Sequence, residues 1–145
     1  MKILIKVKLF ITFSMLVSQL LMSAVVFADT SVIVHPGNKA VLNSKDIQRI
    51  FLGKMKEFSP GKAATPIDQP FGTKARTEFI EAIIKKPEKQ TRAYLAIMLF
   101  TGAGIIPREE SDVALIKKTV AENQDAIAYI DSALVDASVR VVYTY

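Results

Sequence analysis

The chain has 145 residues with 19 basic and 14 acidic side chains, so its formal net charge is +5. It contains no cysteine, which excludes disulfides, thiolate metal sites, cysteine nucleophiles and a lipid-anchored N-terminal cysteine. Its single histidine leaves no imidazole pair for a metal. We therefore expect neither a metal nor a cofactor.

The N-terminal segment has the pattern of an export signal. Lysines precede an almost wholly apolar run over residues 9–27, and Ala28 offers a small residue at a cleavage point. We predict a signal peptide over residues 1–28 and one periplasmic domain over residues 29–145. The apolar run also approaches the length of a membrane span, so an uncleaved anchor is the alternative.

Charge is unevenly distributed along the predicted domain. Residues 39–92 carry 12 basic and 6 acidic side chains, whereas residues 93–145 carry 4 basic and 7 acidic ones. A positive first half attracts anions, although a solvated lysine-rich surface explains the same pattern. Nucleic acid is a poor partner, because the excess is small and aromatic residues do not interleave it.

Hydrophobic periodicity predicts four strands and four helices. In chain order they are a strand over 31–34, a helix capped by Ser44 and ended by Gly53, a strand over 64–68, helices over 73–84 and 87–100, a helix capped by Ser111 and stopped by 123–125, and strands over 126–130 and 139–143. Residues 101–110 are predicted to be a flexible connection. This order predicts an α/β layer fold, a mixed sheet flanked by helices, with the strand order left open.

Catalytic interpretations find little support in the sequence. His35 lies beside a turn proline, and no nucleophile-elbow sequence accompanies it. The acidic run over 109–112 lies at a predicted helix start, where acids stabilise the helix dipole. Residues 102–104 (Gly-Ala-Gly) lack the lysine and the spacing of a phosphate loop. We therefore predict that the protein is not an enzyme.

The remaining candidate is the start of the helix over 73–84. Gly72 allows a sharp turn into the helix, and Thr73 adds a hydroxyl. Lys74 and Arg76 place positive charge on the first turn, where helix amides can hold an anion. The alternative is an ordinary N-cap, with Thr73 satisfying its own helix and two solvated cations.

Three segments together resemble the periplasmic phosphate-binding protein family, especially its short, single-lobe relatives, the phosphate ABC transporter substrate-binding proteins. Residues 42–58 resemble the helix and Leu-Gly-Lys turn that enter the second lobe, with Phe58 in place of a tryptophan. Residues 66–79 resemble the strand and phosphate loop, and residues 126–130 resemble a late strand of the family. The resemblance implies one lobe of a type II periplasmic binding protein.

The phosphate loop of the family carries over only in part. Gly72 and Thr73 match its Gly-Ser pair. Gln69 stands where the family has an arginine, and Phe71 stands where it has an aspartate. Arg76 would replace the lost arginine's charge from within the helix. The other departures from the loop are Lys74 and Ala75.

The resemblance implies binding of phosphate or a related oxyanion, with an ABC-transporter membrane component or another envelope protein as partner. The expected ligand-binding residues are Gly72, Thr73, Arg76, Lys74 and Gln69. A single lobe would leave one side of the ligand in water, where charge contacts weaken. A homodimer would restore a second wall, but the sequence does not show one. The alternative function is a ligand-free interaction module that uses the same lobe as a partner-binding surface.

Overall fold

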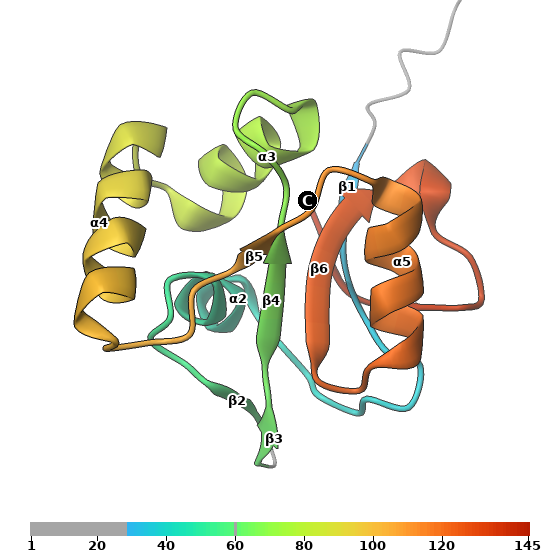
Figure 1. The fold of residues 1–145 in the computed structure, drawn as a ribbon. Coiled ribbons are helices and arrows are strands. Elements are labelled where there is room, and N and C mark those ends of the chain that lie inside the picture. The colour runs from blue at the N-terminus through green and yellow to red at the C-terminus, as the bar shows by residue number, and fades with distance from the viewer. Residues whose placement is uncertain (1–28, 60) are drawn as a thin grey trace, which may run out of the picture.

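The computed structural model describes residues 29–59 and 61–145 (Figure 1). The predicted signal peptide falls on residues 1–28, outside the described residues. In chain order the elements are β1 (Thr30–Val34), α2 (Ser44–Phe51), β2 (Glu57–Phe58), β3 (Lys62–Ala63), β4 (Thr65–Asp68), α3 (Lys74–Phe79), the π-helix η2 (Ile80–Ile84), α4 (Glu88–Thr101), β5 (Arg108–Glu109), α5 (Val113–Glu122), β6 (Ala126–Asp131), the 3-10 helix η3 (Ser132–Leu134) and β7 (Arg140–Thr144).

The main sheet is mixed, as predicted, and has the strand order β5-β4-β6-β1-β7. Strand β4 runs parallel to both β5 and β6, whereas β1 runs antiparallel to β6 and β7. Parallel pairing of Thr65 with Ala126 brings the carboxyl ends of β4 and β6 to the same edge of the sheet. The residues that follow β4 therefore lie beside the last residues of β6.

Helices cover both faces of this sheet. Along β1, Val32 and Val34 point to a core shared with α2, α3 and η2, whereas Ile33 points to a second core under α5. This alternation follows from the two-residue period of a strand, and every residue of β1 is buried. The predicted α/β layer fold is confirmed.

Two predicted helix caps are wrong by one residue. The first helix is capped by Asn43 rather than Ser44, because the Asn43 side chain accepts from backbone N–H groups and Asp46 completes a capping box. The later helix is capped by Asp112 rather than Ser111. In each case a neighbouring Asn or Asp takes the role, and these residues cap as well as serine does.

The connection over residues 101–110, predicted to be flexible, is held at two points. A Cβ added at Gly104 would lie 2.7 Å from the backbone oxygen of Gly53, so the two backbones pack closely there. Further on, β5 pairs with the end of β4, and Glu110 N–H donates to the Asp68 carbonyl at 2.9 Å. Strand β5 and the β2–β3 hairpin were not predicted, because two-residue strands carry no periodic signal.

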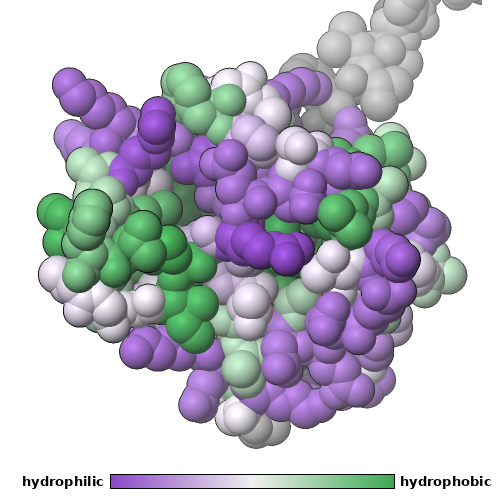
Figure 2. All heavy atoms as spheres, in the orientation of Figure 1, coloured by the Kyte–Doolittle hydropathy of each residue, from purple (hydrophilic) through white to green (hydrophobic). Residues whose placement is uncertain are grey.

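Helix α4 lies at the outer edge of the molecule, away from the main sheet (Figure 1). Thr91 is the one residue of α4 that is fully buried. Apolar residues gather over this helix in the space-filling view (Figure 2). Across residues 29–59 and 61–145, none of the helices combines the length and the apolar character needed to span a membrane.

Candidate functional site

The start of α3 is built around Gly72 and Thr73. Gly72 has a φ of 87°, a left-handed conformation that favours glycine. The Thr73 hydroxyl accepts from Arg76 N–H at 3.3 Å and donates to the Pro70 carbonyl at 3.0 Å. Thr73 is therefore an N-cap whose hydroxyl is used within its own turn.

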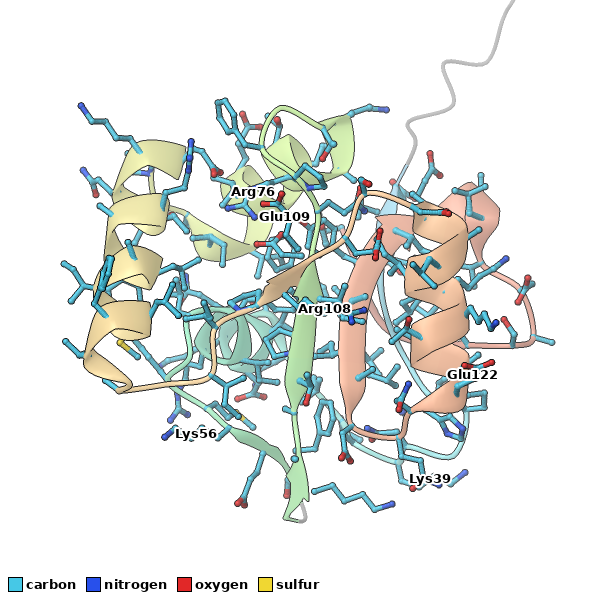
Figure 3. The ribbon with its side chains drawn as sticks, in the orientation of Figure 1. Lys39, Lys56, Arg76, Arg108, Glu109 and Glu122 are labelled. Carbon is cyan, nitrogen blue, oxygen red and sulfur yellow. The ribbon has the colours of Figure 1, made fainter. Side chains whose placement is uncertain are left out.

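The Arg76 side chain is buried, with 5 % of the residue exposed, and it lies between two carboxylates. Its Nη1 donates to Asp68 at the end of β4 and to the Gln69 carbonyl at 3.3 Å. Its Nε and Nη2 donate to Glu88 Oε1 at 3.1 and 2.9 Å. Figure 3 shows Arg76 between α3 and α4, near the end of β4. The guanidinium thus joins three elements.

Asp68 is also held from the neighbouring strand. The Tyr129 hydroxyl of β6 donates to Asp68 Oδ1, and Gln69 N–H donates to the same oxygen at 2.8 Å. The Gln69 side chain donates through Nε2 to the Tyr129 carbonyl at 2.9 Å. A buried polar network therefore crosses the parallel pair β4–β6, and each member has a hydrogen-bond partner, as buried polar groups require.

These contacts keep both Arg76 and Tyr129 in their ordinary protonation states. Burial alone would lower the pKa of Arg76, but the charge of Asp68 and the hydrogen bonds to Glu88 and Asp68 raise it above its usual value. Burial and the adjacent Asp68 raise the pKa of the Tyr129 hydroxyl well above its ordinary value of 10.0. The cluster of Arg76, Asp68 and Glu88 holds one positive guanidinium between two acidic side chains.

A cavity of about 530 Å³ opens between α3, η2 and the start of α4. Its lining includes Gly72 and the charged residues Arg76, Glu81, Lys85, Lys86 and Glu88. Three cationic side chains therefore face two anionic ones. Over the described ranges of the chain, no group of three or more histidine, aspartate or glutamate side chains is placed to hold a metal ion.

The sequence-predicted site residues divide into two groups. Gly72 and Arg76 line this cavity. Thr73 caps its helix, and Gln69 is buried against Tyr129. The Lys74 side chain is 71 % exposed and lies 3.5 Å from Glu78.

Three members of the site were not predicted from the sequence: Asp68, Glu88 and Tyr129. An acidic residue at the end of a parallel strand was the available signal for Asp68, because that edge is where open α/β sheets gather polar groups. Glu88 follows a proline at a helix start, where an acidic residue is ordinary. Nothing in the local sequence pairs it with Arg76, which precedes it by 12 residues.

No family model matches the chain, and no curated protein sequence matches it. Solved structures do match its fold. An ABC-type phosphate transport receptor from Vibrio cholerae superposes with a TM-score of 0.61 at 14 % identity, covering 79 % of this chain and 46 % of the receptor. A candidate phosphate ABC transporter substrate-binding protein from Clostridium perfringens, solved with bound phosphate, superposes with a TM-score of 0.63 at 22 % identity, over 79 % and 45 % of the two chains.

PstS from Borrelia burgdorferi gives a TM-score of 0.58 at 13 % identity, covering 79 % of this chain and 47 % of that protein. The chain thus spans less than half the length of each of these solved structures. The family resemblance read from the sequence is confirmed at the level of the fold. The chain has the fold of one part, less than half, of a phosphate ABC transporter substrate-binding protein.

Proposed function

We propose that the protein is a non-catalytic, periplasmic solute-binding lobe that binds phosphate or a similar oxyanion weakly, at the cavity lined by Gly72 and Arg76. The observation that carries this proposal is the Glu88 carboxylate on the Nε and Nη2 atoms of Arg76. A guanidinium presents these two donors as a fork that fits two oxygens of a carboxylate or a phosphate. Glu88 is therefore an internal oxyanion at a place where a ligand oxyanion fits.

The ligand would take the place of Glu88 rather than enter an empty site. The Glu88 side chain is 21 % exposed, so solvent and a small anion reach it. Lys85 and Lys86 line the same cavity and would face the displaced carboxylate or the ligand. Because the ligand must first break the ion pair between Arg76 and Glu88, its affinity for the protein is low.

The fold likeness supports the same ligand class. One matching structure holds bound phosphate, and another is described as a phosphate transport receptor. In this role the lobe would pass its ligand to an ABC-transporter membrane component. Thr73 and Gln69, expected from the sequence as ligand contacts, would act on the ligand only indirectly, through the helix start and the Asp68 network. Lys74, also expected as a contact, is 71 % exposed beside Glu78 and would have no role in binding.

Calorimetric titration with phosphate and sulfate at low ionic strength tests the proposal. We expect binding in the millimolar range that weakens with added salt, because part of the attraction is between exposed charges. Lys86→Gln should weaken binding, whereas the control Lys74→Gln should leave it unchanged, since Lys74 does not line the cavity. A flat titration for the unmodified protein would contradict oxyanion binding.

The second candidate function is a ligand-free interaction module, and the outer side of α4 favours it. Ile97 and Phe100 of α4 are 61 % and 89 % exposed, although exposed helix faces are normally polar. A partner surface on α4 needs no oxyanion at Arg76. Phosphate titration of a Phe100→Ser variant distinguishes the two functions, because only oxyanion binding should survive the change.

A further inference from the structure

Helix α4 presents apolar residues to solvent along one side of its last two turns. Residues 93–107 carry no charged side chain. Ala93, Ala96, Ile97 and Phe100 are all exposed, and their spacing places them on one helix face, here called the α4 stripe. The last turns of α4, from Ala93 onward, are apolar on every side, and such a helix segment is normally covered on every side. Within residues 29–59 and 61–145, nothing covers the α4 stripe.

The opposite side of α4 already has its own contacts. Thr91 is buried, and Tyr94 packs against the core beneath α2 and η2. The Met98 methyl lies next to Gly104, where an added Cβ would come within 2.5 Å of it. The α4 stripe is therefore a second apolar face, not a core face that has turned outward. Figure 2 shows the resulting apolar area over this edge of the molecule.

Basic residues border the α4 stripe on both flanks. On one flank Lys54 lies 5.4 Å from the ring centre of Tyr94. Lys54 and Lys86 both line a smaller cavity beside α4, separate from the cavity at Arg76. On the other flank Lys89 and Arg92 line a further cavity together with one acidic residue, Glu88, so the basic residues are in excess there. The surface that covers this edge should therefore combine apolar groups with negative charge.

We propose that the α4 stripe docks on an anionic lipid surface. The apolar side chains would enter the boundary between headgroups and acyl chains, and the flanking lysines would lie among the lipid phosphates. The apolar part of this docking is separate from oxyanion binding, because no residue of the α4 stripe lines the cavity at Arg76. Lys86 lines that cavity and also borders the stripe, so the variants used below leave it unchanged.

Charge and shape favour lipid over the other occupants. A second copy related by a two-fold axis would bring the four basic residues of each copy, Lys54, Lys86, Lys89 and Arg92, into one interface, where like charges repel. A helix-binding protein groove would have to enclose α4, yet one side of α4 is already packed against Gly53 and Gly104. A lipid plane needs only the outer side of a helix at the edge of the fold, which is where α4 lies (Figure 1).

The absence of cysteine makes a local test available. A single spin label at Ile97→Cys reports on the α4 stripe, and one at Leu134→Cys, 48 % exposed on η3, is the matched control. The mature chain predicted from the sequence, residues 29–145, is mixed with vesicles of phosphatidylcholine alone or with added phosphatidylglycerol, because the apolar run over residues 9–27 would itself enter lipid. With the anionic vesicles, the label at 97 should gain accessibility to oxygen and lose accessibility to a water-soluble nickel complex. The label at 134 should not change.

Variants identify the forces involved. Phe100→Ser should lower vesicle binding at the labelled stripe by roughly tenfold or more, whereas Leu134→Ser should not. The double change Lys54→Gln and Lys89→Gln should weaken binding to anionic vesicles, and Lys39→Gln with Lys118→Gln should not. Phosphate titration of Phe100→Ser should match the unmodified protein, so failure of lipid docking and failure of oxyanion binding give different results.

Three outcomes would overturn the proposal. The first is a label at 97 that stays equally accessible to the nickel complex with and without anionic vesicles. The second is a label at 97 that is protected from both reagents without lipid and more so at higher protein concentration, which would mean that a second copy covers the α4 stripe. Equal protection by a soluble acidic protein but not by vesicles would likewise replace the lipid with a protein partner.

Discussion

Arg76 of α3 donates three hydrogen bonds to Glu88 of α4, from Nε to Oε1 at 3.1 Å, from Nε to Oε2 at 3.3 Å and from Nη2 to Oε1 at 2.9 Å. The same guanidinium donates to Asp68. One side chain therefore attaches the first turn of the outer helix to the edge of the sheet. The pair of Arg76 and Glu88 therefore stabilises the fold. Under the proposed function, Glu88 also occupies the position on Arg76 that a ligand oxyanion would take.

Replacing Arg76 tests the structural role. Arg76→Ala would leave the buried Asp68 carboxylate without its cationic partner, and breaking such a pair costs about 3 kcal/mol of unfolding free energy. Arg76→Lys should cost less, since an ammonium keeps the charge but cannot form the fork. Urea unfolding measures both.

The control for this prediction is Arg92→Ala. Arg92 is exposed and stacks over the Phe71 ring at 5.3 Å, an interaction worth about 1 kcal/mol or less at such a site. Equal losses for the Arg76 and Arg92 variants would mean that the buried network does not stabilise the fold.

Replacing Thr73 separates capping from ligand contact. Thr73→Ala should lower the unfolding free energy by about 1 kcal/mol, because it removes the acceptor for Arg76 N–H. Phosphate affinity should change little, since the hydroxyl is already used by Arg76 and Pro70. Thr77→Ala, an exposed neighbour on the same helix, is the control for stability. A large loss of affinity without a loss of stability would instead make the Thr73 hydroxyl a ligand contact.

The buried Tyr129 hydroxyl predicts sensitivity to high pH. Because burial and Asp68 raise its pKa in the folded state, the unfolded chain loses this proton first, near the ordinary value of 10.0. The contribution of this hydroxyl to the free energy of unfolding should therefore be fully present below that pH. Above it the free energy of unfolding should fall, with a slope of about 1.4 kcal/mol per pH unit for one such group.

Urea unfolding between neutral pH and strongly alkaline pH measures this slope. Tyr129→Phe should lower this slope and leave the part that comes from Tyr145, whose pKa burial also raises. The variant also loses the hydrogen bond to Asp68 and is less stable at neutral pH. Tyr94→Phe on α4 is the control and should keep the slope of the unmodified protein. A slope that Tyr129→Phe leaves unchanged would assign the alkaline sensitivity to another group.

Much of the fold was accessible from the sequence, because strong periodic signals specify it. The β-branched run of β1 and the apolar spacing of α2 and α5 each point to a buried face, and the structure buries them as expected. Strand β5 could not be predicted, since two residues have no measurable period and their pairing with β4 is set by the tertiary fold.

The site was less accessible for a different reason. Gly72 and Thr73 were identified as a helix start, and the structure confirms that position. The direction of the Arg76 side chain depends on Asp68 and Glu88, which come from two other elements. Local sequence shows that a cation lies on the first turn, but it does not show which carboxylates will reach that cation. Charge counted along the sequence therefore overstated the positive potential at this helix start.

Phosphate titration of a Glu88→Gln variant tests the central claim most directly. The change removes the internal oxyanion from Arg76 and leaves the Asp68 contact in place, so we expect phosphate to bind about tenfold more tightly than to the unmodified protein. Glu81→Gln removes an equal charge from the same cavity lining, but it should raise the affinity much less. Equal affinities for the unmodified protein and the Glu88 variant, or equal gains for both variants, would contradict exchange of Glu88 for an oxyanion at Arg76.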